Sequence, residues 1–165
     1  MNVVALEIER KFLVVQDVFR SYPRSLLQQG YLNRDTFRTV RVRVSDELAW
    51  LTVKGETVGA SRLEFEYSIP VGEGRQLMKL CLETPIEKHR FVIPWGNHVW
   101  QVDEFLGENR GLILAEIELR SEDECFEKPQ WIGREVTSEP RYYNSSLSVH
   151  PFQDWLLDEE GRDDS

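Results

Sequence analysis

Apolar and polar side chains alternate with a period of two along most of this sequence. Between residues 40 and 44, for example, Arg41 and Arg43 alternate with Val40, Val42 and Val44. Successive side chains of a β-strand point to opposite faces, so this alternation predicts strands with one apolar face and one charged face. The predicted strands are Leu6–Val14, Leu26–Leu32, Phe37–Val44, Ala49–Gly55, Ser61–Ile69, Lys88–Ile93, His98–Phe105 and Leu112–Arg120.

Short turn sequences, such as those at residues 45–46 and 94–97, separate several of the predicted strands. Connections this short favour antiparallel pairing of successive strands. Helical patterns are fewer, and Pro151 should break the last of them. The expected helices are Gly74–Leu82, a short helix opening at the capping-box sequence Ser121–Glu124, and Ser145–Leu157. The predicted fold class is therefore α+β, with a dominant antiparallel sheet.

The length of 165 residues and a hydrophobic content of 41% indicate one domain with a sizeable core. We expect this domain to cover residues 1–157. The acidic stretch from Asp158 to Ser165 is expected to be a disordered tail.

The composition also bounds the location and the partners of the chain. Two cysteines, Cys81 and Cys125, are too few for a disulfide framework, so a reduced cytoplasmic location is expected. The sequence shows no signal-peptide pattern and no run of about 18 apolar residues, so no membrane partner is expected. The formal net charge of -9 argues against a nucleic-acid partner. The oligomeric state stays open, with a homodimer among the alternatives.

The polar faces of the predicted strands are almost wholly charged, and acids and bases lie on different strands. The charged residues form pairs whose members are two positions apart. The acidic pairs are Glu7/Glu9 and Glu116/Glu118, and the basic pairs are Arg41/Arg43 and Lys88/Arg90. For any single strand, such a face is also what a solvated sheet surface shows. Taken together, the segregated charges favour a sheet that closes with its charged face inward, which also removes its edge strands.

A closed cavity that holds both signs of charge requires a ligand, because unpaired buried charges are costly. Arginine and lysine make charge-assisted hydrogen bonds to phosphate oxygens. Paired carboxylates suit hard divalent cations such as Mg²⁺ or Mn²⁺. A polyphosphate with a divalent metal ion satisfies both sets, whereas nucleic acid leaves the acids unexplained and a bare metal site leaves the bases unexplained.

The segment EIERKFLV, from Glu7 to Val14, resembles the ExExK signature of the CYTH superfamily, the triphosphate tunnel metalloenzymes. Further steps resemble the family in the same order: Gln29-Gly30-Tyr31, Arg41-Val42-Arg43, Thr52-Val53-Lys54-Gly55, Arg62-Leu63-Glu64-Phe65-Glu66, Glu87-Lys88-His89-Arg90, Asp103, Glu116-Ile117-Glu118, Glu135-Val136-Thr137 and Arg141-Tyr142-Tyr143-Asn144. The likeness covers Leu6 to Leu147 and is strongest to short bacterial members that are similar to inorganic tripolyphosphatases. Tyr143 departs from the family pattern, which often has a lysine or a small residue there.

The resemblance implies a closed eight-stranded antiparallel β-barrel, a tunnel with helices packed outside and a triphosphate inside. The substrate-binding residues that it implies are Lys11, Arg41, Arg43, Lys54, Arg62, Lys88 and Arg90. The metal-binding residues that it implies are Glu7, Glu9, Glu64, Asp103, Glu116 and Glu118, for Mg²⁺ or Mn²⁺. Candidates for accepting the proton of the attacking water are Tyr31, Lys11 and Glu118.

The leading hypothesis is thus a metal-dependent hydrolase that converts tripolyphosphate to pyrophosphate and phosphate. Three alternatives stay open: a thiamine or nucleoside triphosphatase, an adenylate cyclase of the same fold, and a non-catalytic polyphosphate-binding module. The presence of all four glutamates, Glu7, Glu9, Glu116 and Glu118, favours an enzyme over the binding module.

On the outer face of the first predicted strand, Arg10 is predicted to be an ion-pair partner.

Overall fold

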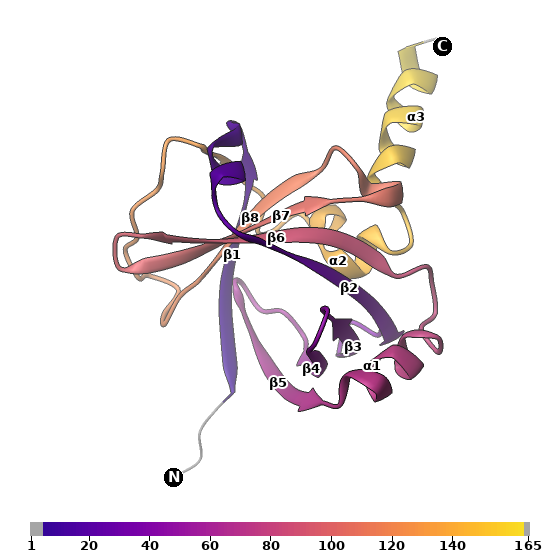
Figure 1. Cartoon of the computed structure of the whole chain (residues 1–165). Helices are drawn as coiled ribbons and strands as arrows, with labels where there is room; N and C mark the ends of the chain where they lie inside the picture. Colours follow the sequence, from indigo (N-terminus) through magenta and orange to yellow (C-terminus); the bar gives the residue numbers. More distant parts are fainter. Residues whose placement is uncertain (1–4, 164–165) are drawn as a thin grey trace.

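The computed structural model describes residues 5–163 and shows a ring of antiparallel strands with helices around it (Figure 1). The strands are β1 (Leu6–Val14), β2 (Arg24–Asn33), β3 (Arg38–Val44), β4 (Ala49–Gly55), β5 (Ser61–Ile69), β6 (Ile86–Trp95), β7 (His98–Phe105), β8 (Ile113–Glu118) and β9 (Ile132–Glu135). Their order is β5-β4-β3-β2-β6-β7-β8-β1-β9, and an additional pairing of β5 with β1 closes the ring. The predicted antiparallel tunnel is therefore confirmed as a ring of strands β1 to β8.

Strand β1 closes the ring because its two edges pair with three different strands. One edge pairs with β8, from Glu9 opposite Glu118 to Leu13 opposite Leu114. The other edge pairs first with β5, where Leu6 lies opposite Leu63, and then with β9. The charged residues Glu7, Glu9 and Lys11 of β1 therefore lie where the ring closes, between β5 and β8.

The strand β9 was not predicted from the sequence. Its four residues are too few to show an alternation, and Gly133 interrupts them. An ideal Cβ on Gly133 would lie 2.7 Å from the Cγ1 atom of Val15, so glycine permits the close approach of this segment to β1. The bounds predicted for β1, β4, β5 and β7 agree with the structure, whereas β2 and β6 are longer and β8 is shorter.

Helical segments are short and lie around the ring. They are η1 (Asp17–Ser21), α1 (Val71–Met78), η2 (Gly107–Asn109), η3 (Pro140–Tyr142), α2 (Asn144–Leu147) and α3 (Phe152–Asp163). Pro151 separates α2 from α3, as predicted. Helix α3 continues to Asp163, so the predicted disordered tail is helical up to that residue, and residues 164–165 lie outside the described part. None of the helices among the described residues has the length and hydropathy that a membrane span requires.

The helix predicted to open at Ser121 does not form. Instead, the carboxylate of Glu124 accepts a hydrogen bond from the backbone N–H of Arg120 and lies 2.7 Å from Nε2 of His98. The carboxylate of Glu122 accepts hydrogen bonds from the backbone N–H of Ala60 and the hydroxyl of Ser61. These acids bind neighbouring strand ends instead of capping a helix, which a local sequence pattern could not reveal.

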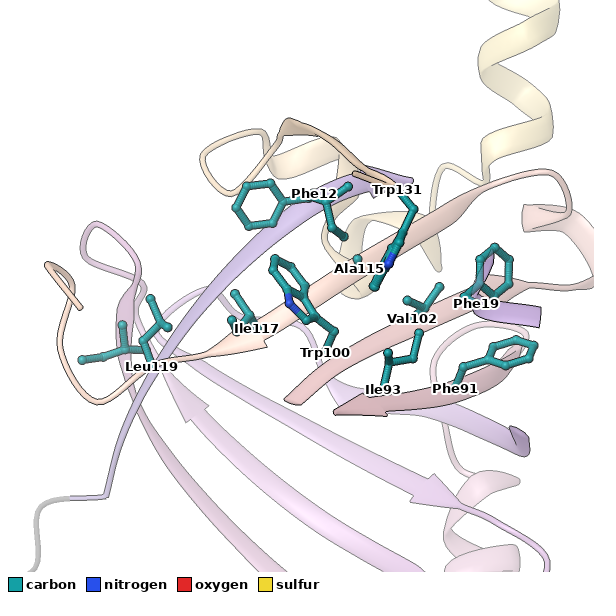
Figure 2. Packing of buried hydrophobic residues seen from close by; sticks show 12 residues of the cluster. Phe12, Phe19, Phe91, Ile93, Trp100, Val102, Ala115, Ile117, Leu119 and Trp131 are labelled. Carbon is teal, nitrogen blue, oxygen red and sulfur yellow. The ribbon is translucent and has the colours of Figure 1, made fainter. Parts of the chain in front are cut away.

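Two apolar clusters cover parts of the outer face of the ring. The larger lies on β1, β6, β7 and β8 under η1 and the segment that ends at Trp131 (Figure 2). In it the Trp100 ring packs edge-to-face against Phe12 at 5.5 Å and Trp131 at 6.0 Å between centroids. The other cluster lies on β3 and β4, where Val42, Val44 and Ala49 pack under α1. With their outer faces covered, these strands must direct their charged faces into the ring.

At one end of the ring the inward faces of the strands become apolar. Leu13 and Phe105 follow a charged residue by two positions on β1 and β7, and Leu114 precedes Glu116 by two positions on β8, so all three share the inward face. They pack in one cluster with residues of the C-terminal segment, which are Val136, Tyr142, Leu147, Phe152 and Trp155. The C-terminal segment thereby fills this end of the ring and leaves the charged part as a cavity.

Candidate active site

A cavity of about 210 Å³ lies inside the ring, and each of the strands β1 to β8 contributes to its lining. The basic lining residues are Lys11, Arg41, Arg43, Lys54, Arg62, Lys88 and Arg90. The acidic ones are Glu7, Glu9, Glu64, Glu66, Glu116 and Glu118. Every site residue expected from the sequence lines this cavity, Tyr31 included, with the exception of Asp103.

Asp103 was expected as a metal ligand, but its carboxylate is taken up by two cations. Its side chain is 2% exposed, and Arg90 donates two hydrogen bonds to it at 2.7 Å each. Lys88 lies 2.7 Å from the same carboxylate. Burial by itself raises the pKa of Asp103, but Arg90 and Lys88 lower it below its ordinary value. Asp103 therefore holds the two basic groups in place, because opposite charges attract strongly in a buried site.

Lys11 and Glu116 face each other across β1 and β8 and form a buried ion pair of 2.8 Å. Burial lowers the pKa of Lys11, yet Glu116 and Glu9 together raise it above its ordinary value. Lys11 is thus held as an ammonium group.

A second network connects Lys54, Glu7, Glu64 and Arg62 at β4, β1 and β5. The Nζ atom of Lys54 lies 3.0 Å from Glu7 and 2.9 Å from Glu64. Arg62 donates to the same carboxylate of Glu7 at 3.1 Å. Burial opposes ionisation of Glu7, but Lys54, Arg62 and a hydrogen bond with Glu64 bring its pKa down to about 2.

Arg41 and Arg43 of β3 are held more loosely. Both reach the carboxylate of Glu66, at 3.4 Å and 3.5 Å, and Arg43 also lies over the ring of Trp50. These contacts are long beside the 2.7 Å pair of Arg90 and Asp103. Burial, together with repulsion from Arg41 and Arg90, lowers the pKa of Arg43 to about 10, so it stays cationic near neutral pH. The two guanidinium groups are therefore available to an anion.

Glu9 and Glu118 are the carboxylates of the cavity that lack a cationic partner. They lie opposite each other on β1 and β8, and neither has a hydrogen bond or an ion pair among the described residues. Burial and the negative charges of Glu116 and Glu7 raise the pKa of Glu9 to about 8. Burial and Glu7 also raise the pKa of Glu118. Lys11 and Lys54 partly oppose these increases, but no cation of the described residues contacts either carboxylate directly.

The C-terminal segment supplies lining residues that the sequence analysis did not assign. These are Thr137, Tyr143, Asn144 and Ser145, which join Thr39, Thr57, Gly59, Ala60 and Gln101 from the ring and its turns. The hydroxyl of Tyr143 donates to the carbonyl of Thr137 at 3.1 Å, and its ring lies 6.0 Å from the ammonium of Lys11. Lys88 donates to Oδ1 of Asn144 at 3.1 Å. The segment Arg141-Tyr142-Tyr143-Asn144 resembles a family motif near the C-terminus, but it shows no alternation that would predict which of its side chains face the cavity.

The outer-face prediction for Arg10 is confirmed. Its guanidinium donates two hydrogen bonds to the carboxylate of Glu135 on β9. Thr137 connects this pair to the cavity side of β1, since its hydroxyl donates to Glu135 and accepts from the backbone N–H of Lys11.

Comparison with known proteins identifies the family. A family model described as the CYTH domain matches residues 5–150. This chain belongs to the CYTH family. The CYTH chain is 50% identical over 151 residues to an inorganic triphosphatase of Acetivibrio thermocellus, covering 90% of this chain and 97% of that protein. It is 36% identical over 148 residues to an inorganic triphosphatase of Nitrosomonas europaea, covering 87% and 97%.

Solved structures show the same CYTH fold. The crystal structure of the inorganic triphosphatase NE1496 matches with a TM-score of 0.63 at 33% identity, covering 87% of this chain and 97% of that chain. A protein from Hippeastrum matches with a TM-score of 0.58 at 15% identity, covering 70% and 80%. At such low identity the second likeness concerns the fold alone.

A divalent metal ion, which membership of this CYTH family implies, fits the donor chemistry of the cavity. Glu9 and Glu118 present unpaired carboxylate oxygens, the ligands that hard divalent cations prefer. Within residues 5–163, no three acidic, histidine or cysteine side chains converge into a ready-made cluster. Magnesium is commonly held by one or two carboxylates together with water and phosphate oxygens, so two free carboxylates are a sufficient protein contribution.

Proposed function

We propose that this protein hydrolyses inorganic triphosphate to pyrophosphate and phosphate, with Mg²⁺ or Mn²⁺ as the metal ion. The observation that carries the proposal is a cavity inside the closed ring, to which each of the strands β1 to β8 contributes and in which charged side chains of both signs predominate. The high identity to two proteins described as inorganic triphosphatases supports the same reaction.

The lining of the cavity favours an inorganic substrate over a nucleotide, because charged side chains that suit phosphate groups predominate in it. Two aromatic residues, Tyr31 and Tyr143, are part of the lining. The Tyr143 ring lies against Lys11 and its hydroxyl is bonded to Thr137, so it is not free to stack on a base.

In the proposed reaction, the basic residues bind the phosphate oxygens and neutralise the charge that develops on the leaving pyrophosphate. Arg41 and Arg43 can turn from their long contacts with Glu66 towards the substrate, whereas Arg90 and Lys88 are fixed by Asp103. The bound metal ion would supply charge neutralisation at the phosphate oxygens, and Glu9 and Glu118 would hold it, with Glu7, Glu64 and Glu116 nearby.

Three residues were candidates for accepting the proton of water, and the geometry favours Glu118. Lys11 is engaged in a 2.8 Å ion pair with Glu116. Tyr31 is 6% exposed, and burial raises the pKa of its hydroxyl, which opposes its action as a base. Glu118 faces the cavity without a cationic partner and could orient and deprotonate water.

The test is a phosphate-release assay with tripolyphosphate, thiamine triphosphate and ATP, each with Mg²⁺ or Mn²⁺. We expect turnover to be fastest with tripolyphosphate and to stop when the metal is chelated. Release of phosphate from ATP or thiamine triphosphate alone would contradict the inorganic substrate, formation of cyclic AMP would indicate the cyclase, and binding without turnover would indicate the binding module.

The double variant Glu9→Gln/Glu118→Gln tests the metal assignment. It removes two facing carboxyl groups without breaking an ion pair, so the thermal midpoint should not fall, while metal-dependent turnover should drop at least about 100-fold. The matched control is Glu87→Gln, an exposed carboxylate on β6, which should keep full turnover. Wild-type turnover in the double variant would rule out these two carboxylates as metal ligands.

A further inference from the structure

Gln29 on β2 is a buried amide without a hydrogen-bond partner. The residue has no exposed surface, and among the described residues neither its Oε1 nor its Nε2 atom is bonded. A glutamine amide can accept at its oxygen and donate twice from its nitrogen. Most buried polar groups in folded proteins are satisfied, so an amide left with neither bond calls for an explanation.

The position of Gln29 on the ring places it beside a phosphate-binding candidate. Tyr31, two residues further on the same strand, lines the cavity, so Gln29 shares the inward face. Across β3 its direct partner is Arg43, and across β6 it is Ile86. Side chains directly opposite each other have Cβ atoms about 4.5–5.5 Å apart. Gln29 and Arg43 are therefore within reach of each other.

Arg43 also has an unsatisfied group. Its Nε atom is buried and has no acceptor among the described residues. Within residues 5–163, its Nη2 atom makes only the 3.5 Å contact with Glu66. An unpaired acceptor on Gln29 and an unpaired donor on Arg43 thus lie on neighbouring strands and the same face.

We propose that Gln29 is a positioning residue for Arg43: its amide oxygen accepts the Nε–H of Arg43, directly or through one bound water, when substrate is present. The Nη atoms of Arg43 are then left free to bind a phosphate group in bidentate fashion. A neutral amide orients the guanidinium without cancelling its charge, whereas the carboxylate of Asp103 compensates the charge of Arg90. This inference rests on the proposed function and extends it to the residue that orients a substrate-binding arginine.

The first test is Gln29→Leu, an apolar substitution of similar size, with Gln29→Met as a second variant that keeps the chain length. We expect KM for tripolyphosphate and Kd for inorganic pyrophosphate to rise about 10-fold, which corresponds to about 1.4 kcal/mol, while kcat changes less. The thermal midpoint should not fall, because the substitution removes an unsatisfied buried amide. A purely structural role predicts the opposite result, a lower midpoint with unchanged KM and Kd, and would overturn the proposal.

The matched control is Gln28→Leu on the outer face of the same strand, where the side chain is exposed and bonded to Glu87. It should leave KM and Kd unchanged. An equal rise of KM in this control would overturn the proposal.

The second test is a double-mutant cycle with Arg43→Lys, which removes the Nε donor. In that background, Gln29→Leu should change the Kd of pyrophosphate less than about 2-fold, because the group it positions is gone. An undiminished 10-fold effect would overturn the proposal. Pyrophosphate binding is measured by calorimetry and needs no turnover, so absence of triphosphatase activity would refute the proposed function without deciding the role of Gln29.

Discussion

The substitution Asp103→Asn examines the buried charge cluster that supports the cavity. Asn has nearly the shape of Asp, but it removes the negative charge that Arg90 and Lys88 share at 2.7 Å. The Lys88 and Asp103 side chains are only 1% and 2% exposed, so solvent screens the uncompensated cations little. Removing one partner of a buried ion pair costs about 3–5 kcal/mol of unfolding free energy. In a domain of this size, 1 kcal/mol corresponds to about 2–4 °C, so the thermal midpoint should fall by roughly 6–20 °C.

The assay is urea and thermal unfolding of the wild type, Asp103→Asn and the control Glu104→Gln. Glu104 is the next residue on β7 but faces outward, where it pairs with Arg20 at 2.7 Å and its side chain is 21% exposed. Loss of such a surface pair should cost about 1 kcal/mol or less. If Asp103→Asn unfolds within about 1 kcal/mol of the wild type, or costs no more than the control, the reasoning about the buried cluster is refuted.

Three further predictions concern acid stability and packing. Because Arg90 and Lys88 lower the pKa of Asp103 below its ordinary value of 3.8, this group contributes stability that is present above pH 3.8 and is lost as the pH falls through the folded pKa. Asp103→Asn should therefore flatten the acid limb of a plot of unfolding free energy against pH, and an unchanged slope would contradict this. Trp100→Ala should lower the unfolding free energy in urea by about 3–5 kcal/mol, because the side chain is 0% exposed; a loss below about 1 kcal/mol would argue against the cluster of Figure 2. Gly74→Ala should lower the thermal midpoint in spite of the better helix propensity of alanine, because the new Cβ would lie 2.5 Å from the Cβ of Ala49; an increase would show that α1 shifts at little cost.

Much of the cavity could be predicted from the sequence because its side chains belong to regular strands. On β3, Arg41 and Arg43 alternate with valines that pack under α1, so their inward direction follows from the period of two. The same reasoning placed Glu9 and Glu118 in the cavity. Alternation shows which side chains face inward, but it cannot show which of them line the cavity and which are covered by their neighbours. Asp103 shares the inward face, yet Arg90 and Lys88 surround it.

Residues outside regular strands could not be assigned in this way. Tyr143 and Asn144 line the cavity because the C-terminal segment folds back and buries Tyr142 and Leu147 at the end of the ring. The helix predicted at Ser121 fails because its acids find partners on other strands instead of at a helix terminus. These outcomes depend on contacts between distant parts of the chain.

Local periodicity and short turns in the sequence are sufficient to predict the strands β1 to β8, the antiparallel pairing of several successive strands and the two faces of each strand. Which charges remain free follows from the folded arrangement. That depends on distances between side chains of different strands: it pairs Lys11 with Glu116 and Lys54 with Glu7, and it leaves Glu9 and Glu118 without partners. Attraction between charges falls with distance and rises with burial, so a linear sequence cannot show which of them compensate each other.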